Sequence, residues 1–148
     1  MVSRKVVLDT SVFIAGIIGH GASKEILMMI LDCNLKIVLS REIIIEYVKV
    51  LSYPRIAKRL KKFYVLSIIS ALYKKAVLVT PGKHIKLCRD PDDDKFIEAA
   101  FEAKAVLISF DDDILSLRNN ENVLQVNNQK ILILTPSEFL KLYKSKQI

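Results

Sequence analysis

Short, unbroken runs of apolar residues recur along the chain, and most of them are followed by a segment with helical periodicity. Such runs, without alternating polar positions, are typical of parallel strands that are buried on both faces of a sheet. The alternation predicts an α/β fold with three layers (α/β/α) and a mostly parallel central sheet. The expected strands are KVVLD ending at Asp9, KIVLS ending at Ser40, AVLIS ending at Ser109 and ILILT beginning at Ile131. The pattern of AVLVTPG does not decide whether it forms a strand.

Helix signals fill the segments between these strands. The expected helices cover residues 11–18, 23–33, 41–52, 58–75, 91–103 and 136–144, with a short helical start in DDDILSL. Ser40 suits the N-cap of the third helix, and Pro54 ends that helix. Asp90 and Pro91 suit the cap and the first position of the fifth, because proline has no N–H that would need a partner there.

Length and composition bound the class of protein. At 148 residues the chain can bury one core, so we expect a single domain over residues 1–148. Its apolar runs are broken by charges well short of the ~20 residues that span a bilayer, and no cleavable leader is expected, which together predict a cytoplasmic protein without membrane contact. The net charge of +7 favours a polyanionic partner, and the lysines of KRLKK, Lys74, Lys75 and KHIK could neutralise phosphates.

The stretch RDPDDDKFIEAA concentrates negative charge at the start of one expected helix. It contains four aspartates within five residues, Asp90, Asp92, Asp93 and Asp94. Capping and the helix dipole explain part of this cluster, at ~0.3 to 1 kcal/mol for each charge in the first turn. On a helical wheel, however, Asp93 shares the apolar stripe that faces the core, whereas Asp94 lies at the edge of that stripe. We therefore expect Asp93 to point inward, with Asp94 as the alternative.

Two further aspartates lie where ligands gather in a parallel sheet. Asp9 closes the first expected strand, and Asp111 closely follows the AVLIS strand. The carboxyl ends of parallel strands meet at one edge of a sheet. Inward carboxylates at Asp9, Asp93 and Asp111 would repel by ~3 kcal/mol per pair at ~6 Å and an effective dielectric of ~20. A positive group must therefore compensate them.

The chemistry of that positive group follows from the residues at hand. The two histidines, His20 and His84, and the two separated cysteines, Cys33 and Cys88, make a poor imidazole or thiolate site. Divalent cations bound by oxygen, Mg²⁺ or Mn²⁺, fit best. Such an ion orients and deprotonates a water and stabilises an in-line displacement at phosphorus, which indicates phosphodiester hydrolysis.

Three segments carry a resemblance to a known family. VVLDTSVFIAGI, LSREIIIEYVKVL and DPDDDKFIEAAFEAKAVLISFDDDIL occur in this order and span nearly the whole chain. Together they resemble a PIN-domain ribonuclease, especially the toxin-like branch of toxin-antitoxin systems. The resemblance implies a catalytic, metal-binding set of four acids, which are Asp9 after the first strand, Glu46 on the helix after the second, Asp93 opening a helix and Asp111 after the next strand. The alternative to Glu46 is Glu42, the alternative to Asp93 is Asp94, and the alternative to Asp111 is Asp113.

The resemblance also implies an activity and partners. The implied activity is metal-dependent endonucleolytic hydrolysis of RNA phosphodiester bonds with Mg²⁺ or Mn²⁺. The implied partners are a second copy of the chain, in a homodimer, and an antitoxin protein that blocks the site. The chain departs from the family at Ser11, where many relatives carry asparagine. We expect Ser11 to orient Asp9 through one hydrogen bond. Ser109 is expected to serve similarly near Asp111, and the alternative for both serines is a helix cap or a strand-end hydroxyl.

Two other functions fit parts of the same pattern. A phosphatase of the haloacid-dehalogenase type also places a nucleophilic aspartate after its first strand, but it requires DxD where this chain has DTS. A non-catalytic RNA-binding module would keep the fold and the basic residues, although it would not need four acids in register. We therefore expect the ribonuclease.

Overall fold

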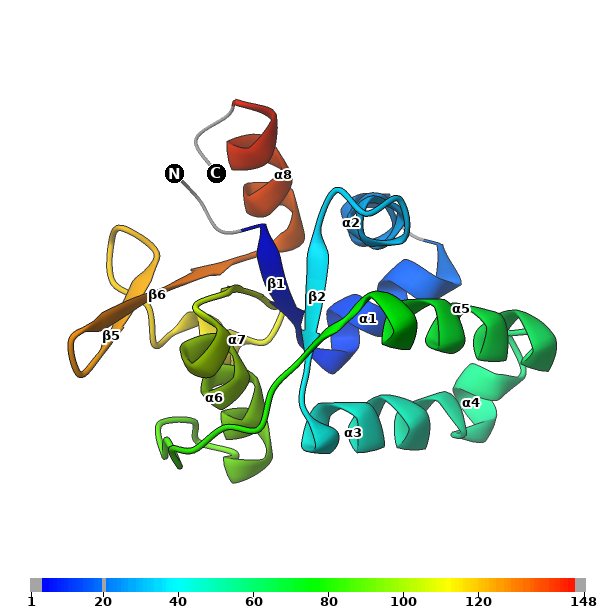
Figure 1. Ribbon diagram of the computed structural model, residues 1–148, viewed down its shortest axis with the longest axis horizontal. Coiled ribbons are helices and arrows are strands. Elements are labelled where there is room, and N and C mark those ends of the chain that lie inside the picture. Colours follow the sequence, from blue (N-terminus) through cyan, green and yellow to red (C-terminus); the bar gives the residue numbers. More distant parts are fainter. Residues whose placement is uncertain (1–3, 20, 146–148) are drawn as a thin grey trace.

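A six-stranded sheet forms the middle layer of the computed structural model, which describes residues 4–19 and 21–145 (Figure 1). The strand order is β3-β2-β1-β4-β6-β5, and every neighbouring pair is parallel except β5 with β6. The strands are β1 Lys5–Leu8, β2 Lys36–Leu39, β3 Val77–Leu78, β4 Val106–Ile108, β5 Val123–Val126 and β6 Gln129–Leu134. This arrangement confirms the three-layer α/β fold with a mostly parallel sheet.

Helices on both sides of the sheet complete the three layers. They are α1 Thr10–Ile18, α2 Gly21–Leu31, α3 Arg41–Leu51, α4 Pro54–Ala57, α5 Lys62–Lys75, the 3₁₀ turn η1 Pro91–Asp93, α6 Asp94–Ala103, α7 Asp112–Leu115 and α8 Pro136–Lys144. Ser40 caps α3 as predicted, since its hydroxyl accepts a hydrogen bond from the Ile43 amide at 3.3 Å. Asp90 caps η1 in the same way, by accepting from the Asp92 amide at 3.0 Å.

The helix expected over residues 58–75 is shorter in the structure. Pro54 opens the separate single turn α4, and α5 begins only at Lys62. Lys61 occupies the N-cap position of α5 with an extended backbone and without a side-chain hydrogen bond. Because the preceding RLK contains none of the usual capping residues, the sequence carries no capping signal for this start.

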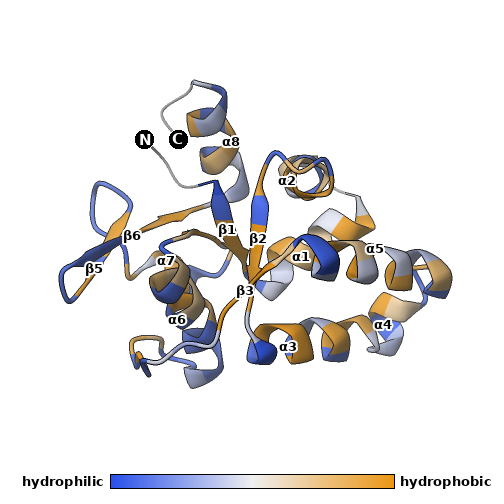
Figure 2. Ribbon diagram, viewed as in Figure 1, coloured by the Kyte–Doolittle hydropathy of each residue, from blue (hydrophilic) through white to orange (hydrophobic). Residues whose placement is uncertain are grey.

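Both edges of the sheet also differ from expectation. AVLVTPG contributes only the two-residue strand β3, while β5 is an unpredicted strand and β6 begins at Gln129 instead of Ile131. In the antiparallel β5–β6 hairpin, Val126 lies opposite Gln129, and Asn127 in the turn has a left-handed φ of 52°. Asparagine tolerates that conformation better than most residues. Figure 2 shows hydrophilic residues at the hairpin tip, and VLQV is too short, with a glutamine inside it, to stand out from a loop.

The buried core lies along the inner strands and the helix faces that cover them. β1 and β4 are almost completely buried, and Leu8 pairs with Ile108 where both strands end. Figure 2 shows hydrophobic residues along β1 after its hydrophilic start. α6 packs against β1, β2 and β4, while α2 packs against α1, α5 and α8. The carboxyl ends of β1 and β4 consequently present Asp9 and Ser109 at one edge of the sheet, where the Asp9 amide donates to the Ile108 carbonyl at 3.0 Å.

Among the helices of residues 4–19 and 21–145, none is by itself long and apolar enough to cross a membrane. α1 and α2 are long and apolar enough only if they are counted together as one span, and this pair is bent by 88°. Both helices contribute buried side chains to the core, among them Phe13 and Ile26.

Candidate active site

Asp9 is a buried carboxylate at the junction of β1 and α1, with an exposed fraction of 4%. Its Oδ1 caps α1 by accepting from the Val12 amide at 2.9 Å. Its Oδ2 accepts from the Ser109 hydroxyl and from the Phe110 amide, the latter at 3.2 Å. Burial raises the pKa of Asp9, and although these hydrogen bonds lower it, the nearby charge of Asp111 adds to the rise. The side chain is held in one orientation, and a cation would relieve the cost of its charge.

Ser109 connects Asp9 with the other acid at a strand end. It is completely buried, and its hydroxyl donates to Asp9 and accepts from the Asp111 amide at 2.9 Å. Ser109 therefore lies beside Asp111 as expected, and it also orients Asp9, the role expected of Ser11. Ser11 is exposed on α1, and the described hydrogen bonds to the Asp9 carboxylate come from other residues. The expectation for Ser11 is wrong because the second position of α1 faces solvent.

Glu46 of α3 reaches the same edge of the sheet and has both carboxylate oxygens occupied. Oε1 lies 2.5 Å from the Lys95 Nζ, and Oε2 accepts from the Thr10 hydroxyl. Lys95 and Thr10 are site residues that the sequence prediction misses. Thr10 directly follows Asp9 and Lys95 directly follows the DDD run, so adjacency to predicted acids is the signal that would find them. Glu42, the alternative to Glu46, is exposed in the first turn of α3.

Asp93 and Asp111 are coupled electrostatically, because, besides burial, the charge of Asp111 raises the pKa of Asp93. Burial raises the pKa of Asp93 to about 7, helped by neighbouring negative charges and by a hydrogen bond to Asp111. Asp111 is itself fixed as the N-cap of α7, where its Oδ1 accepts at 2.8 Å from the amide two residues later. Its charge acts on both Asp9 and Asp93, and the charge of Glu46 acts on Asp93. The structure thus brings all four predicted acids into one electrostatic cluster.

Asp94 is more deeply buried than Asp93, the reverse of the expectation. It is 7% exposed, and its Oδ1 accepts from two backbone amides of the preceding segment, at 3.1 and 2.8 Å. The helical wheel fails because residues 91–93 form a 3₁₀ turn, so the 100° periodicity of α6 begins only at Asp94. Asp94 secures the preceding segment, while Asp93 stays half-buried at the cluster. The alternative to Asp111, Asp113, pairs with the exposed Arg89 at 3.3 Å.

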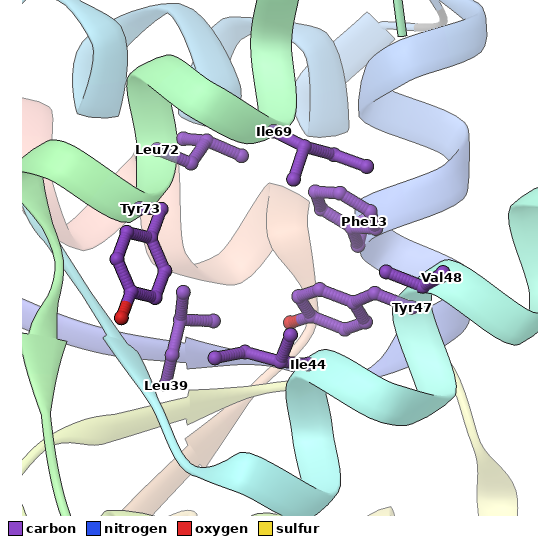
Figure 3. Close-up of a pocket in the computed structure, with 8 residues that line it drawn as sticks. All are labelled: Phe13, Leu39, Ile44, Tyr47, Val48, Ile69, Leu72 and Tyr73. Carbon is purple, nitrogen blue, oxygen red and sulfur yellow. The ribbon is translucent and has the colours of Figure 1, made fainter. Parts of the chain in front are cut away.

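An aromatic pair sets the position of α3 relative to β1. The Tyr47 hydroxyl donates to the Leu8 carbonyl oxygen at 2.5 Å, and its ring stacks on Phe13 with centroids 3.9 Å apart. Figure 3 shows this pair facing side chains of α5 around a cavity of about 30 Å³. Such a cavity has room for at most one or two waters, so it is packing space and not a substrate site. Tyr47 thereby places its neighbour Glu46 within reach of Thr10.

The donor atoms of the cluster suit a hard divalent cation, because they are carboxylate oxygens without thiolate or imidazole. Within the part of the chain that the structure describes, no three His, Cys, Asp or Glu side chains converge to hold a metal ion by themselves. Mg²⁺ needs only one or two protein carboxylates, since waters and substrate phosphates complete its shell. Asp9, Asp93 and Asp111 can supply these. His20 lies outside the described residues, and burial raises the pKa of Cys88 to about 12, which keeps its thiol neutral.

Two similarities to known proteins cover most of the chain. The family described as PIN domain matches residues 5–113. The chain is also 34% identical over 143 residues to the uncharacterized protein MJ1680 of Methanocaldococcus jannaschii, an alignment that covers 93% of this chain and 90% of the relative. The span matched by the family includes Asp9, Glu46, Asp93 and Asp111, and it confirms the resemblance to a PIN domain that the sequence motifs indicate. The chain belongs to the PIN-domain family.

Proposed function

We propose that this protein is a metal-dependent endoribonuclease that hydrolyses RNA phosphodiester bonds with Mg²⁺ or Mn²⁺. PIN domains are generally nucleases, so family membership supports a hydrolase that acts on nucleic acid. The observation that carries the proposal is the close pair of Asp93 and Asp111 beside Asp9 and Glu46. Carboxylates so crowded are unfavourable without a cation, and a cation there would lie at the edge of the sheet where ligands bind.

Each acid has a defined task in the proposed reaction. When bound, the divalent ion would supply Lewis-acid charge and an activated water. Asp9, Asp93 and Asp111 would hold the ion directly or through water, and Ser109 keeps Asp9 in the required orientation. Glu46 completes the acidic pocket, where its two oxygens accept from Lys95 and Thr10.

The distribution of charge supports a polyanionic substrate. Eleven of the 23 lysines and arginines lie in residues 47–89, a segment that contains no aspartate or glutamate. The other twelve share the rest of the chain with all 16 acidic residues. The segment includes α4 and α5, which lie together at one side of the molecule (Figure 1). Phe63 is 84% exposed there, beside the half-exposed Tyr64. Aromatic faces among cations suit base stacking and phosphate contacts of single-stranded RNA.

The biological setting is proposed from the resemblance to toxin-like PIN domains. On that basis we propose a cytoplasmic toxin of a toxin-antitoxin pair, active as a homodimer whose site an antitoxin protein blocks. Co-expression with the product of the adjacent gene tests this role. That product should form a complex with the chain and suppress RNA cleavage.

Cleavage of labelled RNA by the purified protein tests the proposed activity. We expect fragments only with Mg²⁺ or Mn²⁺, and about a hundredfold less cleavage by Asp9→Asn, because asparagine keeps the cap on α1 but lacks the charge. Glu42→Gln is the matched control, since it removes an exposed negative charge from α3. Equal cleavage by wild type and Asp9→Asn, or cleavage without metal, would exclude the assignment.

Two other results would identify the alternative functions. Hydrolysis of a small phosphoester, with an aspartyl-phosphate trapped at Asp9, would identify a phosphatase. Retention of RNA without turnover under either metal would identify a binding module.

The raised pKa of Asp93 predicts that metal stabilises the protein more at high pH. The pKa of Asp93 is about 7 in the folded protein against 3.8 for an ordinary aspartate, so the metal-free fold loses stability as the pH rises between these values. In thermal melts, Mg²⁺ should therefore raise Tm more at about pH 8 than at about pH 5. Asp93→Asn should remove this difference, and a Mg²⁺ shift that is equal at both pH values would contradict the assignment.

A further inference from the structure

Lys95 is a largely buried cation inside the acidic cluster. It is the second residue of α6, and its Nζ lies 2.5 Å from Glu46 Oε1, with side-chain exposures of 18% for Lys95 and 23% for Glu46. The Arg89–Asp113 pair at the rim differs, because the Arg89 side chain is 86% exposed. Exposed pairs are strongly screened, whereas partly buried pairs are screened much less. The Lys95 contact therefore belongs to the interior of the site.

Lys95 divides the cluster into two electrostatically different parts. Glu46 is satisfied on both oxygens, by the Lys95 ammonium on Oε1 and the Thr10 hydroxyl on Oε2. Among the described residues, neither Asp93 nor Asp111 forms an ion pair, so neither carboxylate has a positive partner. The aspartates therefore lack a compensating side chain, which the glutamate has.

We propose that Lys95 withholds Glu46 from the divalent ion, so that the ion is bound by the aspartates of the cluster and Glu46 is not a ligand. This inference rests on the proposed function, because it assumes that the aspartates bind a metal. The Lys95 ammonium already supplies positive charge at Glu46. A divalent ion would bind the glutamate only by displacing this ammonium. Lys95 is a positioning residue, since it acts through Glu46.

Titration calorimetry with Mn²⁺, in the absence of RNA, tests this inference. Lys95→Met should tighten binding about tenfold, because the freed Glu46 adds an uncompensated negative charge to the site. Lys95→Arg should bind like the wild type. Glu46→Gln should weaken binding by about tenfold, the mirror of Lys95→Met, because it leaves the Lys95 charge uncompensated. Asp93→Asn should weaken binding by more than about a hundredfold, because it removes a ligand as well as a charge.

Arg89→Met is the matched control for the loss of one positive charge near the site. Arg89 is exposed and pairs with Asp113, so its replacement should change the Mn²⁺ affinity by less than about twofold. If Arg89→Met tightened binding as much as Lys95→Met, net charge and not the Lys95–Glu46 pair would set the affinity, and the inference would be overturned.

The remaining outcomes separate this inference from the proposed function. A wild-type protein that binds no Mn²⁺ would overturn both. Wild-type binding with unchanged affinity in Lys95→Met, or a loss in Glu46→Gln as large as that in Asp93→Asn, would overturn the inference alone. If circular dichroism showed that Lys95→Met does not fold, the comparison of Glu46→Gln with Asp93→Asn would still decide, because it leaves Lys95 in place.

Discussion

Asp93→Asn should lower metal-dependent RNA cleavage by about a thousandfold while the protein stays folded. Asparagine has the shape of aspartate but lacks the charge that would hold a cation beside Asp111. The Asp93 side chain makes no capping hydrogen bond to α6, so the exchange removes little that stabilises the helix. Single-turnover cleavage at saturating Mg²⁺ measures the first effect, and a thermal melt without metal measures the second.

Asp92→Asn is the matched control for this experiment, since it makes the same change in charge one residue earlier. Asp92 is exposed in the 3₁₀ turn, where its charge is screened by solvent. We expect its cleavage rate to lie within about twofold of the wild type. Equal losses in both variants would mean that the net charge of the acidic stretch matters and not a specific ligand. Full activity of Asp93→Asn would remove Asp93 from the site.

The order of strands and helices is predictable from the sequence because burial on both faces makes each inner strand an unbroken apolar run. β1, β2 and β4 meet that condition. β5 does not, since its residues are partly exposed and its pairing depends on the neighbouring β6 more than on its own pattern. The start of α5 at Lys62 escapes prediction for a different reason, because no side chain caps it.

The candidate site is predictable only in part, because a sequence places residues on elements but does not bring elements together. Asp9 and Asp111 follow from the strand ends that precede them. Glu46 follows from the family resemblance, since the helical pattern would suit a solvated glutamate equally well. The inward direction predicted for Asp93 by the helical wheel is wrong, because Asp93 belongs to a 3₁₀ turn, yet the turn leaves it beside Asp111.

Compensating charge at the crowded acids comes from different sources. Crowded acids require positive charge, but repulsion alone does not say whether an ion or a side chain supplies it. At Glu46 the structure supplies it from Lys95, 49 residues away in the chain. Repulsion therefore argues for a metal at Asp9, Asp93 and Asp111, and not at the glutamate.

Asp94→Ala should lower the free energy of unfolding by about 2 kcal/mol, because it leaves two partly buried donors without a partner. Asp94 Oδ1 accepts from the amides of Leu87 and Cys88 at 3.1 and 2.8 Å, and the side chain is almost fully buried. Chemical denaturation measures the loss. Cleavage should fall as well, since the segment that these amides secure leads directly into the turn that carries Asp93.

Asp94→Asn separates this structural role from metal binding. Asparagine keeps a carbonyl oxygen that can accept from both amides, so its free energy of unfolding should stay within about 1 kcal/mol of the wild type. It should also keep most of the RNA cleavage, because Asp94 holds the backbone and not the ion. If Asp94→Asn were fully stable but as inactive as Asp93→Asn, the third metal ligand would be Asp94. Stability and cleavage measured on both Asp93→Asn and Asp94→Asn therefore decide which of the two residues binds the ion. The backbone contacts need only a hydrogen-bond acceptor, whereas the ion needs a negative charge.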